Sequence, residues 1–102
     1  MKRLPPVHPG EVLLEDFMKP HGLTPYRVAK DIGVPALRIN QIVRRERGIS
    51  ADTALRLARY FGTSAGVWMR MQARYELEVA QRELEGRISR EVKIFRATQA
   101  AA

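Results

Sequence analysis

Apolar residues between residues 24 and 47 recur at the spacing of two short helices that pack across each other. Within each predicted helix they lie three or four positions apart, which places them on one face. Gly33 ends the first helix, because a left-handed backbone there costs a residue with a Cβ about 1–2 kcal/mol. A short Gly-Val-Pro turn follows. The pattern predicts a helix-turn-helix motif, carried by Val28, Ala29, Ile32, Gly33, Val34, Ile39 and Ile42.

Prolines, glycines and capping residues divide the chain into five predicted helices, and no strand pattern is strong. Proline suits the first turn of a helix, and serine or threonine suits the N-cap position. The five helices are expected to begin near Pro9, Thr24, Pro35, Ser50 and Ser64, and to end near Pro20, Gly33, Arg44, Gly62 and Glu85. We therefore expect an all-α domain with a long fifth helix.

The fifth predicted helix has two apolar faces. One face carries Trp68, Met71, Tyr75 and Val79, and the other carries Met69, Ala73, Leu77, Ala80 and Leu84. One face can pack on the other helices, whereas the second needs a different cover. A partner subunit is the favoured cover, so Met69, Ala73, Leu77, Ala80 and Leu84 are the expected homodimer interface. The alternative is that the C-terminal tail folds back over them.

The pattern beyond Gly86 allows two structures. Ile88, Val92 and Phe95 have helical spacing, whereas Val92-Lys93-Ile94 alternates like a strand. The final ATQAAA has no anchoring side chain and is expected to fray. We therefore divide the chain into a helix-turn-helix domain, residues 1–87 with the motif at about 24–47, and a tail, residues 88–102. The tail either packs on the domain or lies in the dimer interface.

The charge is concentrated on the motif. Eight arginines and lysines against three acids between residues 21 and 62 account for +5 of the net charge of +7. Such a basic surface supplies the sequence-independent part of nucleic-acid affinity.

Cysteine is absent, which excludes disulfides and thiolate chemistry. We see no signal peptide and no apolar run long enough for a membrane, and expect a cytoplasmic protein.

The polar side of the third predicted helix is the candidate DNA-reading surface. Arg38, Asn40 and Gln41 are expected at base edges, because arginine pairs with guanine and asparagine or glutamine with adenine. Ala36 and Leu37 can contact a thymine methyl group, although Leu37 can equally belong to the core. Arg27 and Arg47 are expected to bind phosphates. The predicted DNA-binding set is Arg27, Ala36, Leu37, Arg38, Asn40, Gln41, Arg44, Arg45 and Arg47. The alternative is an ordinary solvated helix face.

No arrangement of residues predicts catalysis or a metal site. His8 and His21 are isolated, and no cysteine or carboxylate cluster accompanies them. His8 is better explained as support for the start of the first helix. Glu11, Glu15 and Asp16 lie in its early turns, where the helix dipole favours acids. We expect neither enzyme activity nor a metal or cofactor.

Three sequence blocks resemble HigA-type antitoxins, a branch of the Cro/C1-like (XRE) family with the lambda repressor-like fold. They are HPGEVLLEDF at 8–17, GVPALRINQIV at 33–43 followed by GISADTALRLARYFG at 48–62, and the segment at 67–80 that carries Trp68, Gln72 and Tyr75. The loop of such proteins often has Asn-Gly before a basic pair, whereas here it reads Arg44-Arg45-Glu46-Arg47. The resemblance implies a homodimer that represses its own operon on double-stranded DNA and neutralises a HigB-like mRNA endonuclease toxin.

Two other functions are compatible with the same residues. A stand-alone, phage-like transcriptional repressor needs the same DNA-reading helix but no toxin partner. An RNA-binding module is disfavoured, because the predicted surface lacks exposed aromatic residues for base stacking. A small basic toxin gene beside this one would separate the antitoxin from the stand-alone repressor.

Overall fold

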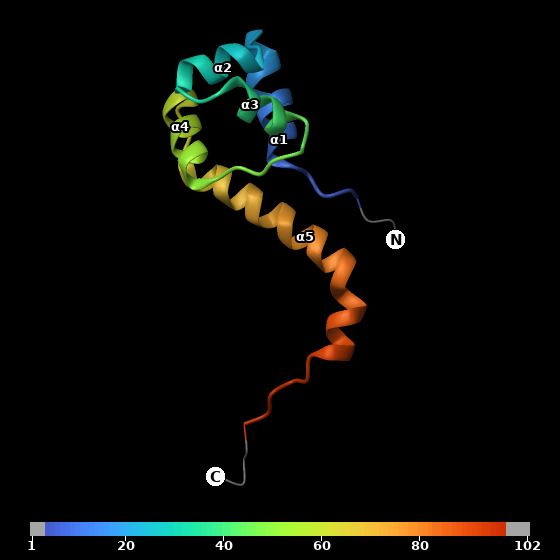
Figure 1. The fold of residues 1–102 in the computed structure, drawn as a ribbon. Helices are drawn as coiled ribbons and strands as arrows, with labels where there is room; N and C mark the ends of the chain where they lie inside the picture. The colour runs from blue at the N-terminus through green and yellow to red at the C-terminus, as the bar shows by residue number, and fades with distance from the viewer. Residues whose placement is uncertain (1–3, 98–102) are drawn as a thin grey trace.

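The structure is a computed structural model that describes residues 4–97. It contains α1 (Pro9–Val12), α2 (Pro25–Ile32), α3 (Ala36–Val43), α4 (Ala51–Phe61) and α5 (Ala65–Glu91), as Figure 1 shows. The described residues form no strand, so the predicted all-α fold with a long final helix is confirmed. The helices α1 to α4 form a compact body, and α5 extends away from it, which gives principal extents of 63 × 32 × 22 Å. None of the described helices is long and apolar enough to cross a membrane.

The first helical segment differs from the single helix that the sequence predicted. After α1 the chain continues as a π-helical segment, Leu13–Met18, and a 3₁₀ turn, Lys19–His21. The π-helical hydrogen bond joins residues five apart, and this turns both Leu13 and Met18 toward the core. Both side chains are fully buried. The segment ends at Gly22, whose φ of +63° lies in the left-handed region, two residues beyond the predicted end near Pro20.

The remaining caps follow the sequence prediction. Thr24, Ser50 and Ser64 each accept a hydrogen bond from a backbone N–H three residues later. Gly33 has a φ of +76°, in the left-handed region that its position at the end of α2 requires. These local signals therefore place α2, α4 and α5 at their observed starting points.

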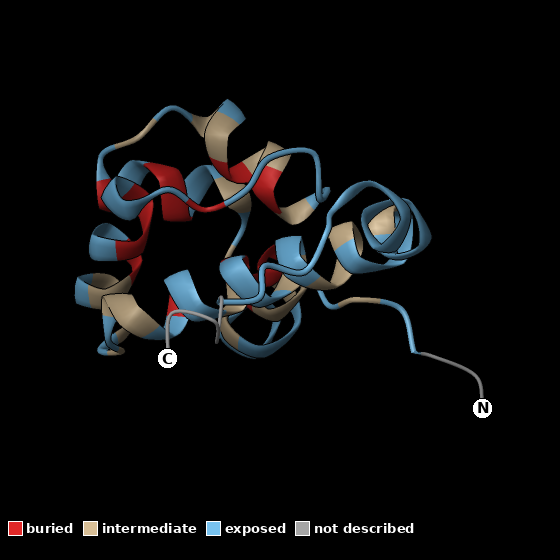
Figure 2. Ribbon diagram, turned by 90° about the horizontal axis from the view of Figure 1, so that it is seen from below, coloured by how far each residue is buried: buried red, intermediate tan, exposed pale blue. Residues whose placement is uncertain are grey.

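The core lies where the first four helices and the start of α5 face one another (Figure 2). Trp68 of α5 is completely buried, and its ring lies 5.1 Å from that of Phe17. Its Nε1–H donates to Thr63 Oγ1 at 2.8 Å, so the buried indole keeps a polar partner. The other buried apolar residues are Leu13, Met18, Val28, Ala29, Ile32, Ile39, Ile42, Ile49, Ala54 and Leu57.

His8 caps α1, in agreement with the structural role expected for it. Its Nδ1 accepts a hydrogen bond from the Gly10 N–H at 2.9 Å, and its ring meets the edge of Tyr75 on α5. Burial, and then the charge of Arg45, lower the pKa of His8. The neutral imidazole can therefore keep accepting from Gly10 and hold α1 against α5.

The fifth helix is longer than predicted and ends at Glu91 instead of near Glu85. Gly86 does not interrupt it, because a helix interior tolerates glycine at a cost of about 1 kcal/mol relative to alanine. Val92 is extended, and residues 92–97 are exposed without forming a strand. They do not cover the second apolar face of α5. The expected fraying of ATQAAA concerns residues 97–102, of which 98–102 lie outside the described residues.

Gly10 sits where α1 approaches α3 most closely, and we predict that Gly10→Ala is strongly destabilising. A Cβ at this position would lie 1.8 Å from the carbonyl oxygen of Ile42, a backbone atom that cannot rotate away. The two helices must separate, which we expect to cost about 1–3 kcal/mol as in other overpacked cores. Urea unfolding measures the loss.

Gly86→Ala is the matched control. Its Cβ would meet only the end of the flexible Arg90 side chain at 3.4 Å. Alanine should therefore raise stability by about 0.5–1 kcal/mol through helix propensity. The predicted close packing is wrong if Gly10→Ala unfolds at the same urea concentration as the unmodified protein.

Candidate nucleic-acid interface

One edge of α3 is buried and the opposite edge faces away from the core. Ile39 and Ile42 are completely buried, and at 100° per residue Leu37, Gln41 and Arg44 lie on the opposite side. Leu37 is 64% exposed, so its alternative assignment to the core is not observed. We call Leu37, Asn40, Gln41 and Arg44 the outer edge of α3. This edge is a helical surface whose apolar, amide and cationic groups suit the major groove.

Three predicted residues of α3 lie off this edge or have partners within the protein. Arg38 lies on the flank that faces α4, where its Nη1 is 3.0 Å from Asp52 Oδ2. The amide of Asn40 donates to the Ala36 carbonyl of its own helix at 3.2 Å. Ala36 is partly buried against the core. The free structure therefore holds the Arg38 and Asn40 side chains in defined orientations.

Arg27 projects from the first half of α2 and belongs to a polar chain that reaches α4. Its Nε lies 2.7 Å from Asp31 Oδ2, which also accepts from the hydroxyl of Tyr60. The hydrogen bonds from Tyr60 and Arg27 lower the pKa of Asp31. The same contacts raise the pKa of Tyr60 and of Arg27. The Arg27 cation is thus kept near the start of the motif, with its side chain 64% exposed.

The loop after α3 carries the other predicted arginines. Arg45 has a φ of +64°, a left-handed conformation that is costly for a residue with a side chain. Arg47 donates to Gln41 Oε1 at 2.9 Å and thereby connects the loop to the outer edge. Arg44 and Arg45 are both exposed.

Gln72 fixes this loop to α5, and the sequence reasoning gave it no role. Its Oε1 accepts from the Ile49 N–H at 2.7 Å in a buried position. A Cβ at Gly48 would lie 2.6 Å from the Gln72 amide, so only glycine leaves room for the contact. The spacing of Trp68, Gln72 and Tyr75 was the available signal. It could not identify the backbone partner, which lies 23 residues away.

Arg56 of α4 supports the turn of the motif and was also missed. Its Nη1 donates to the carbonyl oxygens of Ile32 at 2.8 Å and Gly33 at 3.4 Å. These carbonyls end α2, where a cation compensates the helix dipole. Its Nε also lies 3.1 Å from Asp52 Oδ2. Arg56 therefore connects the end of α2 to the start of α4, a contact that no local pattern encodes.

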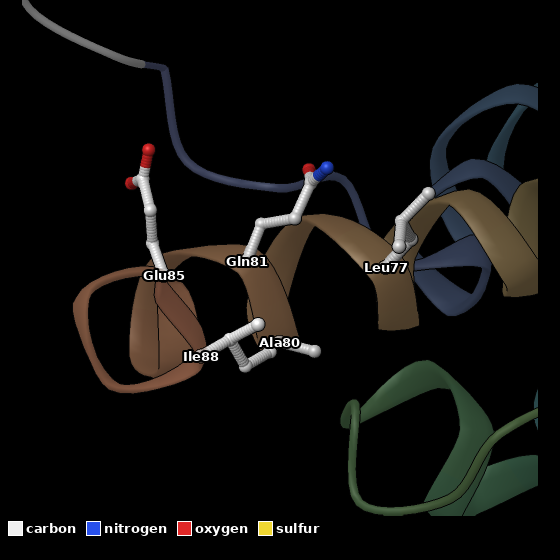
Figure 3. A pocket seen from close by; sticks show the side chains of 5 residues that line it. All are labelled: Leu77, Ala80, Gln81, Glu85 and Ile88. Atoms are coloured by element: carbon white, nitrogen blue, oxygen red, sulfur yellow. The ribbon is translucent and has the colours of Figure 1, made fainter. Parts of the chain in front are cut away.

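The predicted dimer residues lie along the outer side of α5. Leu77 is 60% exposed and Met69 38%, Ala73 is also exposed, and Ala80 and Leu84 are partly buried. A pocket of about 490 Å³ lies here. It is lined by Leu77, Ala80, Gln81, Glu85 and Ile88, whose side chains Figure 3 shows. Ile88 continues the apolar stripe because α5 extends beyond the predicted end. The sequence reasoning had placed it in the tail.

No group of three or more metal-ligating side chains occurs among residues 4–97. The groups that the candidate interface presents are therefore arginine cations, side-chain amides and apolar side chains, all held on helices. Contact of the nine predicted residues with DNA stays a prediction.

Known proteins are similar to this chain in both sequence and structure. A family model described as helix-turn-helix matches residues 14–68. Virulence-associated protein I of Dichelobacter nodosus is 51% identical over 80 residues, which are 78% of this chain and 74% of the relative.

Two solved structures extend the similarity to nearly the whole chain. Pseudomonas aeruginosa antitoxin HigA with the higBA promoter has a TM-score of 0.86 and 42% identity, covering 89% of this chain and 99% of that one. Antitoxin GraA in complex with its operator has a TM-score of 0.87 and 33% identity, covering 95% and 98%.

Proposed function

Because the chain belongs to the helix-turn-helix family and to its HigA-type antitoxin branch, we propose that it is the antitoxin of a type II toxin–antitoxin module. In this proposal it is a non-enzymatic, cytoplasmic protein that represses its own operon and neutralises a HigB-like mRNA endonuclease. The outer edge of α3 carries the proposal, because it faces away from the core, combines apolar, amide and cationic side chains, and is surrounded by arginines. Two similar antitoxins were solved with promoter or operator DNA.

The outer edge of α3 enters the major groove of double-stranded DNA. An α-helix fits this groove, where Gln41 can pair with adenine and Leu37 can contact a thymine methyl group. Arg27 reaches phosphate from α2, and Arg45 and Arg47 reach it from the loop. Such phosphate contacts fix the register of the helix, whereas the base contacts select the sequence.

The outer side of α5 forms a homodimer with a second copy. Residues 92–97 leave Leu77 and Ile88 exposed, and an isologous contact between two copies covers the same stripe on both. Two α3 helices related by a two-fold axis then enter successive major grooves about 34–36 Å apart. The operator of such a dimer is nearly palindromic.

Toxin neutralisation uses surfaces other than the outer edge of α3. Most of residues 9–91 are helical, so inhibition comes from docking a folded surface rather than from a disordered segment that folds on binding. The surfaces left for this role are the outer side of α1, the polar side of α5 and the tail.

Selection of bound duplexes from a random library, followed by affinity measurements, tests the DNA-reading surface. We expect a near-palindromic sequence. Gln41→Ala should relax the preference at one position per half-site by about 1–3 kcal/mol. Arg27→Ala should weaken binding to all duplexes equally. It should also reduce the steepness of the plot of log affinity against log salt concentration by about 1. Enrichment of a single asymmetric half-site would contradict the two-fold arrangement.

Leu77→Glu tests the dimer because it places a charge in the apolar stripe along the outer side of α5. We expect light scattering at micromolar concentration to detect monomers or aggregates. Leu55→Glu is the control, since Leu55 is 64% exposed on α4 and outside the stripe. It should leave the dimer intact. The dimer proposal fails if the unmodified protein is already monomeric at that concentration.

The double substitution Arg38→Ala with Arg44→Ala separates repression from neutralisation. In cells that express the cognate toxin, repression of a reporter should be lost while growth protection survives at matched antitoxin levels. Loss of protection by a folded variant would show that the two surfaces overlap. Absence of protection by the unmodified protein would instead favour a stand-alone repressor.

A further inference from the structure

Asp52 connects the DNA-reading helix to the rest of the motif through a single oxygen atom. Its Oδ2 lies 3.0 Å from Nη1 of Arg38 and 3.1 Å from Nε of Arg56. Arg56 is itself fixed by the carbonyls that end α2. The Arg38 guanidinium is therefore held by a carboxylate whose own position is set by a second arginine.

A purely structural role does not account for this arrangement. An acid in the first turn of α4 is favoured by the helix dipole, but that effect needs no contact with a residue 14 positions earlier. Asp52 and Arg38 keep 56% and 29% of their side chains exposed, and such exposed ion pairs contribute little to stability. The contact instead controls where the Arg38 cation lies.

The charge of Asp52 would also act on DNA bound along α3. It is the only acid bonded to the flank of α3 within the described part of the chain, and it lies beside a surface that must approach phosphates. Non-specific DNA binding depends on phosphate contacts, so a fixed negative charge weakens it. The same charge weakens sequence-specific binding less, because the hydrogen bonds between a correctly oriented arginine and a base edge depend on geometry.

We propose that Asp52 is a specificity-determining residue that acts through Arg38. It orients the guanidinium toward one base pair and opposes its use as a general phosphate anchor. This inference rests on the proposed function, since it requires that α3 read a sequence. Asp52 is therefore a positioning residue, and its effect should appear in the ratio of specific to non-specific affinity.

The test uses the full-length protein, the duplex selected by the unmodified protein, and a shuffled duplex of equal composition. Asp52→Asn keeps the size of the side chain and removes its charge. We expect affinity for the shuffled duplex to rise about fivefold, the effect of one unit charge a few ångströms from a phosphate in water. Affinity for the selected duplex should change less, so the specificity ratio falls.

Two controls separate this role from general charge and from folding. Asp16→Asn makes the same charge change at an exposed residue of the Leu13–Met18 segment, and it should leave the ratio unchanged. In the Arg38→Ala background, Asp52→Asn should no longer alter base preference at the position that Arg38 reads, because its partner is absent. Circular dichroism confirms that each variant is folded.

The outcomes distinguish the inference from the function on which it rests. Failure of the unmodified protein to enrich any duplex contradicts the proposed function itself. With enrichment, an unchanged ratio for Asp52→Asn overturns the role of Asp52. An equal change of base preference with and without Arg38 shows that Asp52 does not act through Arg38.

Discussion

Helix α3 packs on the core through one edge, and the other features of the candidate interface depend on this constraint. Ile39 and Ile42 are fully buried, whereas Leu37 on the opposite side is largely exposed. Burial of an isoleucine contributes about 1.5–3 kcal/mol, whereas an exposed ion pair contributes about 0–1 kcal/mol. The core therefore determines where α3 lies, and the polar contacts determine how its side chains are presented.

Close contacts around α3 keep this attachment rigid. Gly10 lets α1 approach the Ile42 carbonyl, Arg56 holds the turn before the helix, and Gln72 holds the loop after it. Each contact comes from a different element. The helix thus has restraints at its inner face and near both ends, and its outer edge packs against no other described helix. Recognition of DNA by such a surface needs little rearrangement of the backbone, which limits the entropic cost of binding.

Signals within a few residues predicted much of the fold. Thr24, Ser50 and Ser64 marked helix starts because capping is a contact between residues three apart. The inward spacing of Ile39 and Ile42 predicted which edge of α3 is buried. The end of α5 was missed, because Gly86 resembles a terminator although neighbouring residues sustain the helix. The π-helical turn was missed because it depends on where Leu13 and Met18 meet the core.

The candidate site was predicted in outline but not in its polar connections. The residue types of α3 predicted which of its sides is the candidate DNA-reading surface. The contacts of Arg38 with Asp52 and of Gln72 with Ile49 join residues 14 and 23 positions apart, so only the folded chain brings them together.

The central claim, that the outer edge of α3 reads DNA, is tested most directly by amide chemical-shift mapping of isotope-labelled protein with the selected duplex. We predict the largest shifts at Leu37, Gln41, Arg44 and the loop to Gly48. Large shifts confined to α5, with α3 unchanged, would contradict the account.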